Sequence, residues 1–285
     1  MSFHDPLRTL LAGVFPGELP SPGWRRGARL AGEALAFTLV GSYLPAAMGF
    51  SQSGMISVFL IAASLTDRFS TLLEENRENI YARSMGAWRA NRITALSLLS
   101  LFLGILAGYA IVAGWLEEAA ITRLFGFTME TAQVGEKSLL QGRFSSLAEI
   151  LLHNTLVLTA IAVLSFVYRS YGAMLGLCWN ACVWAFVLTV LSERAGTASD
   201  LSPPLFFALA LAALLPHLTC EGFGYVLGAL AAIFTSKAVV SYSLGDARVR
   251  EVARVAALLL ACAFGMLLLA AILESTLAPA LLARL

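Results

Sequence analysis

Two histidine–glutamate pairs lie in apolar stretches of this sequence, and each pair has a spacing of four residues. His217 and Glu221 follow Pro216, whereas Glu149 precedes His153. Side chains four residues apart share one face of a helix, so each pair can act on a single point. Neutral imidazole and carboxylate are ligands for zinc or iron, and both groups also transfer protons. The two pairs therefore indicate chemistry that involves a metal ion or a proton.

Further polar residues in the apolar segments complete a predicted polar core. Its members are Glu149, His153, Asn154, Asn180, His217, Glu221 and Glu274. Ionisable groups at bilayer depth are costly, so they face the protein interior, pair with one another or do chemistry. Three interpretations stay open: a hydrogen-bonded contact that fixes helix packing, a metal site, or a proton or ion relay. For the metal site, the predicted ligands are His153, His217, Glu221 and Glu149.

The composition shows which elements must position these residues. Hydrophobic residues make up 59% of the 285-residue chain and charged residues only 13%, which excludes an ordinary soluble domain. Several apolar windows of roughly 20 residues are long enough to cross a hydrocarbon core of ~30 Å as helices. We predict one all-α domain over residues 1–285, a polytopic transmembrane helix bundle of about 6–7 membrane segments. The net charge of +1, without a basic run, argues against nucleic acid as a partner.

The charges between the apolar stretches predict an orientation in the membrane. Residues 1–30 read as an amphipathic, cytoplasmic N-terminal segment. Arginine is in excess over 66–92, which indicates a cytoplasmic interfacial helix, and Arg169 marks a tight cytoplasmic turn. The polar stretch 116–148 suits the extracytoplasmic side. We therefore expect a multi-pass protein of the cytoplasmic (inner) membrane, with the N-terminus in the cytoplasm and the C-terminus outside.

The segment that holds His217 is predicted to be broken. Residues 205–215 would form a half-helix, because Pro216 cannot donate a backbone hydrogen bond and disfavours helix in the residue before it. A second helix would then run over about 219–240. Its small residues are predicted to be close helix-packing contacts, as small residues are in membranes. They are Gly222, Gly224 and Gly228.

The polar core lies in a pattern that resembles the stage II sporulation protein M family over 149–279. The residues that carry the resemblance are Leu151-Leu152-His153-Asn154, Gly172, Gly176 and Asn180, Leu215-Pro216-His217, Glu221, and Glu274 with Pro279. Two positions depart from the family pattern, since Ala181 and Leu218 stand where the family has glycine. The resemblance implies an integral membrane protein. In spore-formers the family works in a peptidoglycan-remodelling complex, where it anchors or recruits wall-degrading partners.

The leading functional expectation is a non-enzymatic scaffold that organises envelope- or peptidoglycan-associated partners. It would bind the lipid bilayer and other membrane or envelope proteins, with a homo-oligomer left open and no cofactor required. The alternative is a metal-dependent intramembrane enzyme of hydrolase type, in which Glu221 or Glu149 serves as general base to water bound by zinc or iron. A small-solute or ion transporter comes third. Neither a His-Glu-x-x-His pair nor a Gly-x-Ser-x-Gly elbow occurs in the chain.

Overall fold

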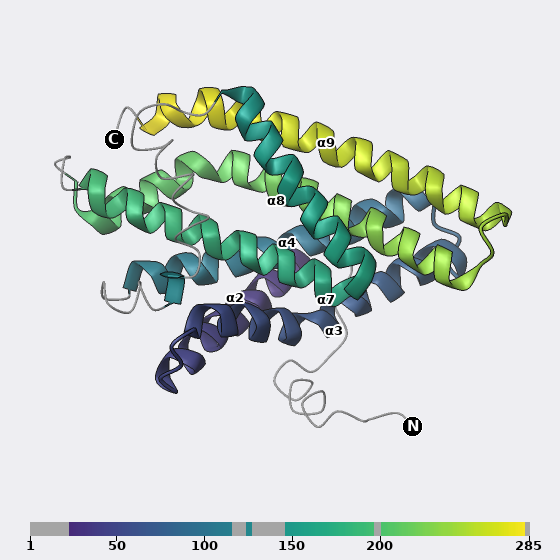
Figure 1. Cartoon of the computed structure of the whole chain (residues 1–285), viewed down its shortest axis with the longest axis horizontal. Coiled ribbons are helices and arrows are strands. Elements are labelled where there is room, and N and C mark those ends of the chain that lie inside the picture. Colours follow the sequence, from purple (N-terminus) through teal and green to yellow (C-terminus); the bar gives the residue numbers. More distant parts are fainter. Residues whose placement is uncertain (1–22, 116–123, 127–145, 197–200, 283–285) are drawn as a thin grey trace.

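The computed structural model describes residues 23–115, 124–126, 146–196 and 201–282, and its long elements are all helices (Figure 1). They are α2 (Trp24–Ala47), α3 (Ser53–Tyr81), α4 (Ala87–Trp115), α7 (Leu147–Gly196), α8 (Pro203–Ser241) and α9 (Ala247–Leu282). Within these ranges, six helices are long and apolar enough to cross a membrane. The predicted all-α polytopic bundle is confirmed. Most of the predicted segments 1–30 and 116–148 lies outside the described residues.

Helix α7 is a helical hairpin, not a single rod (Figure 1). At Arg169 the backbone has φ 53° and ψ −128°, and the chain reverses between a first arm (147–168) and a second arm (170–196). Positive φ is uncommon for a residue other than glycine. Gly172 allows the two arms to approach, because a Cβ atom there would overlap the backbone carbonyl of Leu164. The turn predicted at Arg169 is confirmed.

Helix α8 packs against three other helices through its glycines. A Cβ atom on Gly222 would overlap the Phe102 ring of α4, and one on Gly228 would overlap Leu158 on the first arm of α7. At Gly224 the added atom would lie only 3.1 Å from the backbone oxygen of Ala263 in α9. The predicted role of these glycines as close packing contacts is confirmed, and it places α8 inside the bundle.

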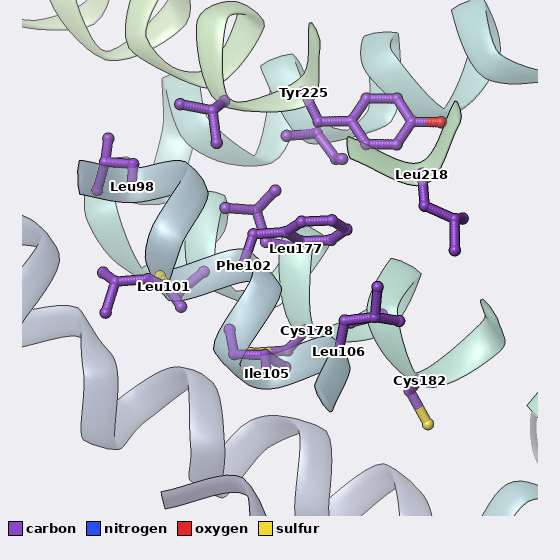
Figure 2. Close-up of a cluster of buried hydrophobic side chains, with 14 of the residues drawn as sticks. Leu98, Leu101, Phe102, Ile105, Leu106, Leu177, Cys178, Cys182, Leu218 and Tyr225 are labelled. Carbon is purple, nitrogen blue, oxygen red and sulfur yellow. The ribbon is translucent and has the colours of Figure 1, made fainter. Parts of the chain in front are cut away.

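A cluster of buried apolar side chains joins α4, the second arm of α7 and α8 (Figure 2). Helix α4 supplies Phe102 and Ile105, which are fully buried. Cys178 from α7 and Leu218 from α8 face the same cluster and are also buried completely. These contacts fix the position of α8 along the axis of α7. They therefore determine which polar side chains of the two helices can form contacts.

The break predicted at Pro216 does not occur, because α8 runs without interruption from Pro203 to Ser241. Pro216 and Leu215 lie on the exposed face of the helix, whereas His217 and Leu218 are buried. The proline ring therefore points away from the neighbouring helices. Packing of the inner face holds the helix together, in the way that membrane helices tolerate proline when their neighbours support them.

Residues 66–92 do not form a separate helix, since α3 continues to Tyr81 and α4 begins at Ala87. Phe69, Leu72 and Leu73 keep the α3 extension buried in the core. The helix therefore continues beyond its first charged residues, Asp67 and Arg68, with apolar side chains on its buried face.

Ion pairs connect the start of α2 to the extended part of α3. The Glu33 carboxylate accepts from Arg29 at 3.0 Å and from Arg68 at 2.8 Å, and its side chain is only 3% exposed. Arg26 binds Glu75 in the same way, at 2.5 Å. An ionised group in such a buried place requires a charged partner, so these pairs hold α2 and α3 in register.

We expect Gly104→Ala to destabilise the protein, because its Cβ atom would overlap the backbone oxygen of Ala31 where α4 crosses α2. Overpacking of this kind costs about 1–3 kcal/mol. Gly114→Ala is the matched control in the same helix, since no atom lies within 4 Å of its added Cβ. The control should be neutral or slightly stabilising. Thermal unfolding in detergent measures both variants, and equal stability of the two would contradict the close α2–α4 crossing.

Candidate functional site

Three ionisable side chains converge between α8 and α9, and we refer to His217, Glu221 and Glu274 as the polar centre. One ligand atom from each lies within 4.8 Å of the other two. Among the described residues, this is the one group of three or more histidine, cysteine, aspartate or glutamate side chains with such geometry. His217 is 1% exposed and Glu221 is 2% exposed, whereas Glu274 is partly buried.

The helical repeat explains how α8 contributes to the polar centre. His217 and Glu221 are one turn apart on the buried face, and Tyr225 follows one turn later. Tyr225 is also fully buried (Figure 2). Helix α9 lies alongside α8 and supplies Glu274, with Gly224 permitting the close approach of the two helices.

The second arm of α7 orients the Glu221 carboxylate. Asn180 donates a hydrogen bond from Nδ2 to Oε1 of Glu221 at 3.2 Å, and Trp184 donates one from Nε1 to the same oxygen at 3.2 Å. The Trp184 indole also packs edge-on against the His217 imidazole, with 5.1 Å between ring centroids and an interplanar angle of 65°. Two residues one turn apart on α7 therefore hold both α8 members of the polar centre.

Several polar atoms of the polar centre have no hydrogen-bond partner. They are both ring nitrogens of His217 and Oε2 of Glu221, and the hydroxyl of neighbouring Tyr225 is also unpaired. A buried polar atom without a partner costs free energy, so such atoms are rare in folded proteins. Chemically, the arrangement can hold a cation between imidazole and carboxylates, or share a proton between the two carboxyl groups.

The predicted polar core is only partly assembled in the structure. Asn180, His217, Glu221 and Glu274 come together, but Glu149 and His153 are exposed near the start of α7. Glu149 has a local role there: its Oε2 accepts the backbone N–H of Ser146 at 2.8 Å, and Ser146 Oγ lies 3.4 Å from the Glu149 nitrogen. This is a capping box.

Asn154 is buried on the first arm of α7, and its Nδ2 has no hydrogen-bond partner. Two aromatic residues at the site, Trp184 and Tyr225, were not part of the predicted polar core. Their spacing was the available signal, because Trp184 is four residues from Asn180 and Tyr225 is four residues from Glu221. Each shares a helix face with a residue already assigned to the polar core.

Fold and site together define a polytopic all-helical membrane protein with a histidine–carboxylate centre enclosed between its last two helices. The chain belongs to the Stage II sporulation protein M family, whose model matches residues 97–279. The matched range begins in α4 and ends at Pro279 in α9, so it contains the whole polar centre. The predicted family resemblance is confirmed. Neither the curated proteins nor the solved structures include a match to this chain.

Substitution of two buried asparagines, Asn180 and Asn154, separates the contribution of a hydrogen bond to stability from the contribution of side-chain packing. Asn180→Ala removes a donor to the buried Glu221 carboxylate, so we expect the free energy of unfolding to fall by about 1–3 kcal/mol. Asn154→Ala leaves a hole of similar size but removes no hydrogen bond from its unpaired Nδ2. The free energy of unfolding should therefore fall clearly less in Asn154→Ala than in Asn180→Ala. Unfolding in detergent compares the two, and equal losses would show that the Asn180–Glu221 bond adds nothing to stability.

Proposed function

We propose that this protein is a non-enzymatic scaffold of the cytoplasmic membrane that organises envelope- or peptidoglycan-associated protein partners. The enclosure of the polar centre is the observation that carries the proposal. His217 and Glu221 are nearly without solvent exposure. A hydrolytic site must admit its substrate and water, whereas side chains enclosed in this way serve to hold helices together. Membership of the Stage II sporulation protein M family supports a role at the cell envelope.

The distribution of basic residues supports an orientation with the N-terminus in the cytoplasm. Ser70, in the second half of α3, donates a hydrogen bond to Ser170 at the α7 turn at 3.0 Å, so this part of α3 lies beside that turn. Lys237 of α8 is close enough to Arg169, Glu74 and Arg77 for the charges of all three to act on it. The same end also carries Arg83, Arg89, Arg248, Arg250 and Arg254. Such an excess of Lys and Arg marks the cytoplasmic side of membrane proteins.

The hairpin in α7 completes this topology. Each of its arms is long enough to cross the ~30 Å hydrocarbon core, at 1.5 Å per residue. Together with the other five helices, the two arms would take the described part of the chain across the membrane an odd number of times. The C-terminus is then outside, opposite the N-terminus.

The metal-dependent hydrolase is less well supported as a function. Its predicted ligand set included Glu149 and His153, and both are exposed near the start of α7, outside the polar centre. Glu149 is also engaged as a helix cap. An enzyme would therefore have to work with His217, Glu221 and Glu274 alone.

The scaffold role predicts that partner binding and biological function survive removal of the Glu221 charge. After crosslinking in cells and purification in mild detergent, the wild-type protein should recover specific envelope proteins. A folded Glu221→Gln variant keeps the shape of the side chain, so it should recover the same proteins and complement a deletion strain. Failure of the wild type to recover any partner would contradict the proposal. So would a folded Glu221→Gln variant that binds its partners but does not complement.

Labelling of introduced cysteines tests the orientation. Ser243 is exposed between α8 and α9 at the basic end, and Ser146 is exposed where α7 begins. In intact cells, a membrane-impermeant maleimide should label Ser146→Cys, whereas Ser243→Cys should react only after permeabilisation. The unchanged protein is the control for the native cysteines, of which Cys178 and Cys182 are buried. The reverse labelling pattern would overturn the orientation.

A further inference from the structure

We propose that His217, Glu221 and Glu274 bind a divalent transition-metal ion, best matched by zinc, which joins α8 to α9. Such an ion would bind whether or not the protein acts as a scaffold. In this ligand set, Glu274 of α9 takes the place of His153 and Glu149, which the sequence predicts as ligands but which are exposed in the structure.

The geometry is already close to that of a metal site. One ligand atom from each of the three side chains lies within 4.8 Å of the other two. Zinc ligands stand at about 2.0–2.2 Å from the ion, which places tetrahedral ligands roughly 3.4 Å apart. The ligand atoms would therefore have to approach one another by at most about 1.4 Å to bind one ion.

The ligand atoms are also free to bind. Neither nitrogen of the buried His217 imidazole has a hydrogen-bond partner, and Oε2 of Glu221 has none. The other Glu221 oxygen, Oε1, is occupied by the donors Asn180 and Trp184. Metal-binding carboxylates are commonly held in this way, with outer hydrogen bonds that orient the ligand towards the ion. The structure therefore presents one oriented, unpaired oxygen and an unpaired imidazole to the same space.

Charge balance favours a cation over a purely hydrogen-bonded centre. Glu221 and Glu274 approach each other in an apolar surrounding, where two like charges repel strongly. No lysine or arginine of the described chain forms a salt bridge with either carboxylate. A divalent ion would neutralise both charges and also give the imidazole a partner. A proton shared between the carboxyl groups would relieve the repulsion but would leave both His217 nitrogens unpaired.

The ligand types select the metal. Carboxylates and water are the usual ligands of magnesium and calcium, whereas imidazole suits zinc and other first-row transition ions. The three side chains would fill three of the four ligand positions of a tetrahedral zinc ion and leave the fourth position open. The buried Tyr225 hydroxyl lies beside the Glu221 carboxylate and is also close enough to Glu274 for the charges of both carboxylates to act on it.

Metal content of the full-length protein tests the proposal. The protein is purified in mild detergent, stripped with a chelator, re-equilibrated with zinc and freed of excess ion. Elemental analysis should find about one zinc per chain in the wild type. Glu274→Gln and His217→Gln each remove a ligand, so zinc affinity should fall at least about tenfold. His153→Gln is the matched control, because this exposed histidine lies outside the polar centre, and it should keep the wild-type zinc content.

Gel filtration and circular dichroism show whether each variant folds. Glu274→Leu replaces Glu274→Gln where the latter does not fold, because leucine also lacks a ligand atom. Cobalt provides a second measurement. In the wild type it should give the visible absorption bands of an ion with nitrogen and oxygen ligands, and these bands should be lost in the Glu274 variant. Absence of bound zinc in the wild type would overturn the proposal. Folded Glu274 and His217 variants that bind zinc as tightly as the wild type would overturn it as well.

Discussion

The burial of Glu221 imposes the strictest requirement on this structure, because a carboxyl group removed from water must find its partners inside the bundle. The partners come from separate segments. Asn180 and Trp184 reach it from the second arm of α7, and Glu274 approaches from α9. Helix α8 must therefore lie between α7 and α9, with a fixed position along its axis and a fixed rotation about it. The glycines of α8 permit the close contacts that this position demands.

A second set of polar contacts has the same effect in the other half of the molecule. Apolar side chains gain little free energy when they move from lipid into a helix interface. Close packing and hydrogen bonds or ion pairs therefore decide which helices associate in a membrane. Glu33 joins Arg29 and Arg68, and thereby ties α2 to α3. Gly104 brings α4 against α2. Helix α4 then connects both halves, because its opposite face belongs to the apolar cluster shared with α7 and α8 (Figure 2).

The sequence allowed prediction of the features that depend on local chemistry. The apolar spans, the turn at Arg169 and the packing role of the α8 glycines all follow from composition and spacing. The assembly of the site depended on contacts distant in sequence. Glu149 and His153 have the same four-residue spacing as His217 and Glu221, yet Glu149 caps a helix start. The expected break in α8 failed for a similar reason, because tertiary packing overrides the local effect of a proline whose ring faces outward.

A double-mutant cycle between His217 and Glu274 tests most directly whether these residues of α8 and α9 form one centre. Each residue is changed to glutamine, alone and together, and the free energy of unfolding is measured in detergent. If both hold the same centre, either single change disrupts it and the second adds little, so the cycle should give a coupling of about 0.5–3 kcal/mol. Stability losses that simply add, with a coupling below about 0.3 kcal/mol, would contradict the account.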